Sequence, residues 1–163
     1  MAKIKAKCHI CNSVSKDDQP PTRCSYCDAD LVNPGAETCL KTTQAQYMPT
    51  ATRGAWDGPL IMTNLRLFFV KNARAGSSGG GLVGALAMEA INAATRGERI
   101  GFTITPGTVT SVEIGKYSVL AQGLIIRTTD GLEHKLAVRK KEQLDWVGAI
   151  QQAFGTQGYS TQG

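Results

Sequence analysis

Four cysteines near the N-terminus carry the clearest chemical signal in this sequence. They form two pairs, Cys8–Cys11 and Cys24–Cys27, each with two intervening residues, and 12 residues separate the pairs. Two thiolates spaced in this way within a tight turn can bind the same ion, and a second such turn completes a tetrahedral set of four sulfur ligands. The spacing predicts a zinc (Zn²⁺) site. Because four protein ligands leave no open position, we expect the zinc to be structural.

The residues around these cysteines predict a small β-hairpin. Lys3, Lys5 and Lys7 alternate with small or apolar residues, which is typical of a strand leading into the first pair. Over residues 1–32 the chain resembles the zinc-ribbon family. The alternatives are two disulfides or a redox Cys-x-x-Cys pair. Zinc is preferred because no secretory signal is seen and no helix of an α/β pattern follows either pair.

Other residues that could do chemistry are few. His9 lies between two predicted ligands and could replace one of them, but we expect it to face solvent. The fifth cysteine, Cys39, is expected to pack as a small apolar side chain or to remain free. His134 alternates with apolar residues, which indicates a buried strand position rather than a catalytic base. The sequence shows no catalytic triad order and no paired-carboxylate motif, and we therefore expect a protein that is not an enzyme.

The composition describes a folded, mildly basic chain. Of its 163 residues 42% are hydrophobic, and 18 Lys+Arg exceed 13 Asp+Glu, which gives a net charge of +5. Four thiolates with one Zn²⁺ would bring this to about +3. Such a charge is compatible with an acidic partner surface. No apolar run reaches the ~18 residues that cross a membrane, and no signal peptide is evident, so we expect a cytoplasmic protein.

Beyond the cysteines, alternating and continuous apolar runs predict a mainly β domain. A polar, turn-rich stretch at 33–44 is expected to be a linker. Seven strands are expected after it, at 45–53, 60–63, 66–70, 100–105, 109–114, 120–128 and 132–138. Trp146, Ile150 and Phe154 then share one face of a helix. The expected fold class is α+β, a curled antiparallel sheet plugged by this C-terminal helix, with a frayed tail at 155–163.

One run within these strands has a family resemblance. Residues 58–69 follow the spacing Gly-x-Leu-x-x-Thr-Asn-x-Arg-Leu-x-Phe. Together with Asp130-Gly131, which predicts a two-residue type I′ turn, and the helix that contains Trp146, this run resembles GRAM and bacterial pleckstrin-homology-like (PH-like) domains over residues 45–154. The resemblance implies a PH-like sheet that attaches to a lipid surface or to a protein. The candidate contact residues are basic: Arg53, Arg66, Lys71 and Arg74.

A glycine- and alanine-rich insertion at 74–97 interrupts this pattern, and from Leu82 its apolar spacing predicts a helix. Three roles remain open. The helix could pack on the sheet, lie at a membrane interface, or form a self-association surface over 80–95, where Gly80 and Gly84 would let two backbones approach. The run Gly79-x-Gly81-x-x-Gly84 matches a dinucleotide-binding fingerprint. We reject that interpretation because no strand directly precedes it and no further βαβ unit follows.

Three functions are compatible with these features. The first is a non-catalytic binding or adaptor module with structural zinc, which engages an anionic membrane surface or a protein partner through its PH-like domain. The second is nucleic-acid binding through the ribbon, with the contact residues Lys3, Lys5, Lys7, Lys16, Arg23 and Tyr26. The third is a homo-oligomeric scaffold assembled through 80–95. We favour the first, because a nucleic-acid surface is expected to carry more charge and more aromatic residues.

Overall fold

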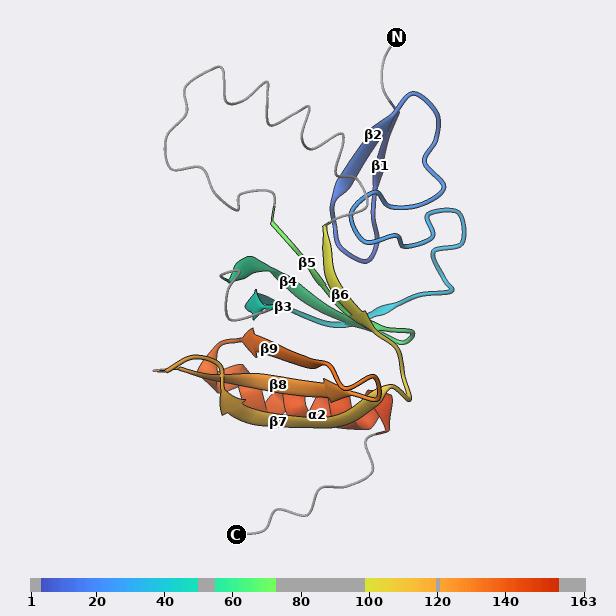
Figure 1. Cartoon of the computed structure of the whole chain (residues 1–163). Coiled ribbons are helices and arrows are strands. Elements are labelled where there is room, and N and C mark those ends of the chain that lie inside the picture. Colours follow the sequence, from blue (N-terminus) through green and yellow to red (C-terminus); the bar gives the residue numbers. More distant parts are fainter. Residues whose placement is uncertain (1–3, 50–54, 73–98, 120, 156–163) are drawn as a thin grey trace, which may run out of the picture.

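A computed structural model of the chain describes residues 4–49, 55–72, 99–119 and 121–155. Within these ranges a two-stranded hairpin, a seven-stranded antiparallel sheet and a helix near the C-terminus form the fold (Figure 1). The hairpin consists of β1 (Ile4–Lys7) and β2 (Val14–Asp17). The large sheet contains β3 (Cys39–Met48), β4 (Trp56–Thr63), β5 (Leu67–Val70), β6 (Ile100–Ile104), β7 (Val109–Lys116), β8 (Gln122–Thr128) and β9 (Glu133–Ala137). A 3₁₀ turn, η1 (Lys140–Glu142), leads into the helix α2 (Gln143–Phe154).

The large sheet is built from two meanders. Its strand order is β6-β5-β4-β3-β9-β8-β7, so the first four strands form one meander and the last three form the other. The two meet where β3 pairs antiparallel with β9, with Tyr47 opposite Leu136. Helix α2 packs against β7 and β8, and its buried face adds Trp146, Ile150 and Phe154 to the core. The mainly β fold class, with an antiparallel sheet and a C-terminal helix, is therefore confirmed.

The most apolar strands are buried on both faces. In β5, Leu67 and Phe69 belong to the central core, whereas Phe68 and Val70 belong to a second cluster on the opposite face. Side chains alternate between the two faces of a strand, so a continuous apolar run requires cover on each side. One cover is the core beneath α2. The other is the N-terminal segment that contains the four cysteines.

Strand β3 begins at Cys39, six residues before the predicted strand start and inside the stretch predicted as a linker. The cause is that its inward residues are polar where they meet α2. Lys41 makes an ion pair with Asp145, and Thr43 Oγ1 donates to Glu142 Oε2 at 2.6 Å. Polar residues on both faces conceal the period of two that marks a strand in the sequence.

The β8–β9 turn differs from the predicted two-residue type I′ turn. Such a turn requires positive φ at both central residues, but of Asp130 and Gly131 only Gly131, at 81°, has it. Thr128 N donates to Leu132 O at 3.1 Å, which closes a loop of three residues with glycine in the left-handed position. The Asp130 carboxylate accepts hydrogen bonds from Leu132 N and Thr128 Oγ1. These bonds stabilise the three-residue loop.

His134 lies in the core of the large sheet, as its spacing predicts. It is buried, its Nδ1 lies 3.1 Å from the Tyr47 hydroxyl, and its ring lies 4.6 Å from that of Phe102. Burial lowers its pKa, which favours the neutral ring. Leu136 and Val138 share this burial, whereas Leu132 is exposed because it stands in the turn rather than in β9.

Candidate metal centre

Each cysteine pair lies in a tight turn, and the two turns share one hydrogen-bond pattern. Cys8 N donates to Ser13 O at 2.9 Å, and Asn12 N donates to Cys8 O at 3.0 Å. Cys24 N and Asp28 N make the equivalent bonds in the second turn, both 2.9 Å long. Asn12 and Asp28 each have a φ of 59°, a left-handed conformation that Asn and Asp adopt more readily than most residues. The sequence therefore places a suitable turn residue directly after each pair.

The two turns bring the four sulfur atoms together. All four Sγ atoms lie within 4.8 Å of one another. The Sγ atoms of Cys8 and Cys27 are 3.6 Å apart, as are those of Cys11 and Cys24. Sulfur atoms placed tetrahedrally ~2.3 Å from a zinc ion would be about 3.8 Å apart. The Ile10 amide donates to Cys8 Sγ at 3.4 Å, and the second turn has the equivalent bond to Cys24. The cluster thus has the size and the ligands to hold one metal ion.

The sulfur atoms also influence one another's protonation. Hydrogen bonds from the neighbouring thiols, first that of Cys11, lower the pKa of Cys8 and bring the pKa of Cys24 to about 6. Contacts with the neighbouring thiols raise the pKa of Cys11 and Cys27. The close contacts among the four sulfur atoms favour the loss of protons from part of the cluster, and the thiolate is the form that binds a metal. Four soft sulfur ligands in this arrangement suit zinc.

The two remaining candidates for chemistry near these turns are not part of the cluster. His9 is exposed, as expected, and its Nε2 lies 3.1 Å from the backbone oxygen of Glu37. Cys39 is also exposed, with its Sγ 3.9 Å from Lys41 O. Neither residue belongs to the group of potential ligands, which within the described residues consists of the four paired cysteines.

The N-terminal segment 4–32, which we call the ribbon, packs against the outer face of the large sheet. Its cysteines and Ile10 form one buried cluster with Ile61 of β4 and with Phe68 and Val70 of β5. Figure 1 shows the ribbon lying at the β4–β5–β6 end of the sheet. Because the four candidate ligands belong to this cluster, the candidate metal site and the sheet share a hydrophobic core, which the sequence analysis did not predict.

A buried ion pair fixes the segment that connects the ribbon to the sheet. Arg66 Nε lies 2.7 Å from Glu37 Oε1, and Arg66 Nη2 lies 3.0 Å from Glu37 Oε2. The side chains are 16% and 9% exposed, so the pair is largely shielded from water. Thr63 Oγ1 donates to Glu37 Oε1 at 2.9 Å. Burial opposes ionisation of Glu37, but hydrogen bonds from Arg66 and Thr63 outweigh it and lower the pKa.

The β4–β5 turn holds the same connecting segment through its backbone. Asn64 Oδ1 accepts from Thr38 N at 2.7 Å, and Asn64 N donates to Thr38 O at 3.2 Å. Thr63 Oγ1 accepts from the amides of Leu65 and Arg66 at 3.2 and 3.0 Å, which shapes the turn. The Thr-Asn-x-Arg run at 63–66 therefore acts as a clamp on residues 37–38.

The four basic residues predicted to contact a membrane or a protein have separate positions. Arg66 is engaged by Glu37, and its guanidinium lies 4.5 Å from the centre of the Phe68 ring. Lys71 Nζ lies 3.9 Å from the centre of the Trp56 ring. Arg53, Arg74 and the predicted helix of the insertion lie outside the described residues, and so does the proposed self-association surface at 80–95.

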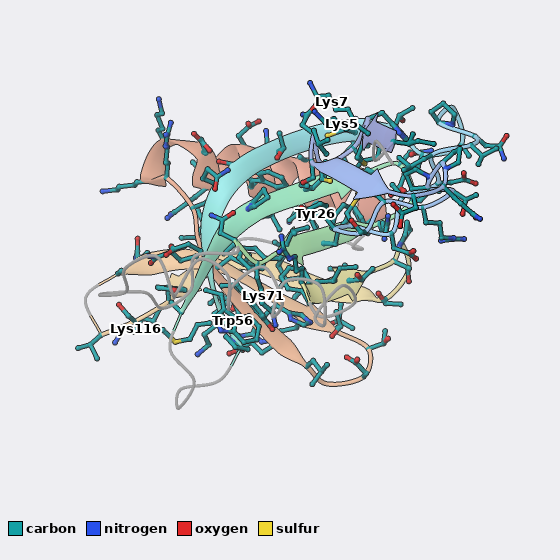
Figure 2. All side chains as sticks on the ribbon, turned by 90° about the horizontal axis from the view of Figure 1, so that it is seen from above. Lys5, Lys7, Tyr26, Trp56, Lys71 and Lys116 are labelled. Atoms are coloured by element: carbon teal, nitrogen blue, oxygen red, sulfur yellow. The ribbon has the colours of Figure 1, made fainter. Side chains whose placement is uncertain are left out.

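The ribbon residues considered for nucleic-acid binding are partly engaged elsewhere. Arg23 makes an ion pair with Asp28 at 2.9 Å, and the Arg99 guanidinium lies 4.6 Å from the centre of the Tyr26 ring. Lys5 and Lys7 are exposed on β1 (Figure 2). Lys3 lies outside the described residues, and the side chain of Lys16 is not described.

Comparisons with known proteins support the fold and go no further. No protein-family model matches this chain, and no curated protein matches it. The C-terminal domain of an unknown protein from Leishmania infantum is similar, with a TM-score of 0.50 and 12% identity over 76% of this chain and 89% of that chain. The DH/PH domains of p115-RhoGEF give a TM-score of 0.46 and 8% identity over 76% of this chain and 32% of that chain. In the described part of the chain, no helix has the length and apolarity to cross a membrane.

Proposed function

We propose that this chain is a zinc ribbon joined to a GRAM- or PH-like domain, and that it acts as a non-catalytic module that binds anionic membrane surfaces. The observation that carries this proposal is positive charge left unpaired at the surface. Of the ten acidic side chains that the structure describes, six are held in ion pairs and four make no ion pair: Asp18, Asp30, Asp57 and Asp130. Six lysines of the same residues make none: Lys5, Lys7, Lys71, Lys116, Lys140 and Lys141.

The metal serves the fold in this proposal. Four cysteine ligands fill a tetrahedral zinc site, so no position remains for water or substrate. Three of the four cysteines are buried, and the cluster continues into Ile61 and Phe68 of the sheet. Bound zinc would therefore stabilise the ribbon and its contact with β4 and β5.

The charge distribution favours a membrane surface over the nucleic-acid alternative. Lysines near an anionic bilayer contribute about 1 kcal/mol each, and they need no defined partner geometry. The ribbon supplies only Lys5 and Lys7 as described cations without an ion pair, and the Tyr26 ring already contacts Arg99. Single-stranded nucleic acids instead require free aromatic faces along a charged groove.

The test is flotation of the zinc-loaded protein with vesicles. We expect binding to phosphatidylcholine vesicles that contain phosphatidylserine, and little binding to pure phosphatidylcholine. The binding should weaken as salt is raised, because screening reduces attraction between exposed charges. Absence of binding to the anionic vesicles at low salt would overturn the membrane function and leave a protein partner as the ligand of the PH-like domain.

A further inference from the structure

The end of the sheet away from the ribbon carries three of the unpaired lysines. Lys116 ends β7, and Lys140 and Lys141 lie in η1, immediately before α2. Figure 1 shows that the β7–β8 hairpin and the start of α2 lie at one end of the molecule, with the ribbon at the other. In Figure 2, Lys116 lies far from Lys5 and Lys7 of the ribbon. These three lysines therefore form a basic surface separate from the metal centre.

A cavity of about 610 Å³ lies between these elements. Lys116 and Lys140 both line it, together with the polar side chains of Ser118, Gln122 and Gln143. Gln143 is buried, and its Nε2 donates to Gln122 O at 3.2 Å and to Val138 O at 3.4 Å. One wall of the cavity is thus held in place by hydrogen bonds, and two cationic side chains border it.

The same end exposes two large aliphatic side chains. Val119, in the β7–β8 turn, is 94% exposed and lines the cavity. Leu144, next to Gln143 in α2, is 77% exposed. A single exposed aliphatic residue is ordinary on a protein surface. Here two exposed aliphatic side chains lie beside unpaired lysines. Proteins that bind a membrane interface use both kinds of side chain, because apolar side chains enter the bilayer and cations attract anionic headgroups.

Nearby carboxylates leave most of this positive charge in place. Glu142 accepts from Thr43 and lies 3.9 Å from Arg139, and Asp145 is paired with Lys41, on the side that faces β3. Asp57 is the unpaired carboxylate near the β7–β8 hairpin. Burial raises the pKa of Tyr117 in this hairpin, and the negative charge of Asp57 raises it further. Three lysines against one unpaired carboxylate leave a net positive surface.

We propose that this end of the protein docks on anionic membranes. Lys116 and Lys140 contact a lipid phosphate at the cavity, and Val119 enters the interfacial region. This inference rests on the proposed membrane function and assigns it to a surface that shares no residue with the basic candidates of the sequence motif.

The test compares three variants with the wild-type protein in vesicle flotation. We expect K116Q/K140Q to weaken binding to phosphatidylserine vesicles roughly 30-fold, because each lysine near such a surface contributes about fivefold. We expect V119S to weaken it about tenfold through loss of apolar burial, with an effect that persists at high salt. K5Q/K7Q removes the same charge from the ribbon at the other end of the molecule, and it should weaken binding far less than K116Q/K140Q, because it lowers only the overall charge. All five residues are exposed, and thermal unfolding would verify that each variant folds.

The outcomes separate this inference from the function on which it depends. Loss of binding in K116Q/K140Q but not in K5Q/K7Q supports the docking surface. Equal weakening in both variants, or no change in V119S, would overturn the docking surface while membrane binding stands. Failure of the wild-type protein to bind anionic vesicles would overturn both and point to a protein partner.

Discussion

Replacing Cys8 and Cys24 by serine is expected to abolish zinc binding and to unfold the ribbon. Structural zinc contributes about 10–16 kcal/mol of apparent binding free energy in small zinc-dependent domains, and residues 4–32 are too few to fold around a core of their own. The midpoint of thermal unfolding of the whole chain should also fall, because Ile61 and Phe68 lose the cover that the ribbon provides. Metal content by mass spectrometry and unfolding followed by circular dichroism would measure both effects.

Cys39→Ser is the matched control for this experiment. Cys39 is exposed and does not belong to the cluster, so its replacement should leave zinc content and stability unchanged. A ribbon that stays folded without zinc after replacement of Cys8 and Cys24 would contradict the metal assignment. So would a wild-type protein that folds fully without any bound metal.

Replacing Glu37 by alanine is expected to destabilise the protein by about 3–5 kcal/mol, because it leaves the Arg66 charge buried without its partner. The Glu37–Arg66 pair also connects the ribbon segment to the β4–β5 turn, so part of the loss should appear in the ribbon. Urea unfolding would measure the change.

The control is Glu113→Ala, which removes a carboxylate from an Arg–Glu pair in which both side chains are about half exposed. This substitution should change the free energy of unfolding by less than ~1 kcal/mol. Equal effects of the two substitutions would contradict the clamp.

The same ion pair predicts a pH dependence. The pKa of Glu37 is lower in the folded protein than in the unfolded chain, because hydrogen bonds from Arg66 and Thr63 exceed the opposing effect of burial. Its contribution is therefore complete above the unfolded value of about 4.3 and is lost as the pH falls through the folded value. Glu37→Gln should remove this part of the acid sensitivity. An unchanged pH profile in that variant would contradict the assignment.

The clustering of the four cysteines and the main elements could be predicted because their signals are local. Two cysteines in one turn, an apolar helix face at Trp146, Ile150 and Phe154, and the run that forms β5 each depend on neighbours in sequence. The start of β3 was predicted six residues too late, because its inward residues Lys41 and Thr43 are polar where they contact Asp145 and Glu142. Its partners lie about 100 residues away, so no local period reveals it.

The parts of the site that could not be predicted depend on contacts between distant segments. Glu37 lies in a polar stretch and gains its role only because Arg66 folds against it. Arg66, which the family resemblance implied as a contact residue, makes this ion pair with Glu37. The burial of Phe68 and Val70 on the outer face of β5 did carry a signal, since a strand that is apolar on both faces requires two covers. The ribbon supplies the second one.

Hydrogen exchange of the whole protein, with and without its metal, most directly tests the claim that the ribbon and the sheet form one folded unit. Strand β5 pairs with β4 and β6, and its outer face is covered by the ribbon. We predict that metal removal by a chelator speeds exchange in residues 4–32 and in β4 and β5, while β7 to β9 stay protected. Faster exchange confined to residues 4–32 would contradict the shared core and leave the ribbon as a separate attachment.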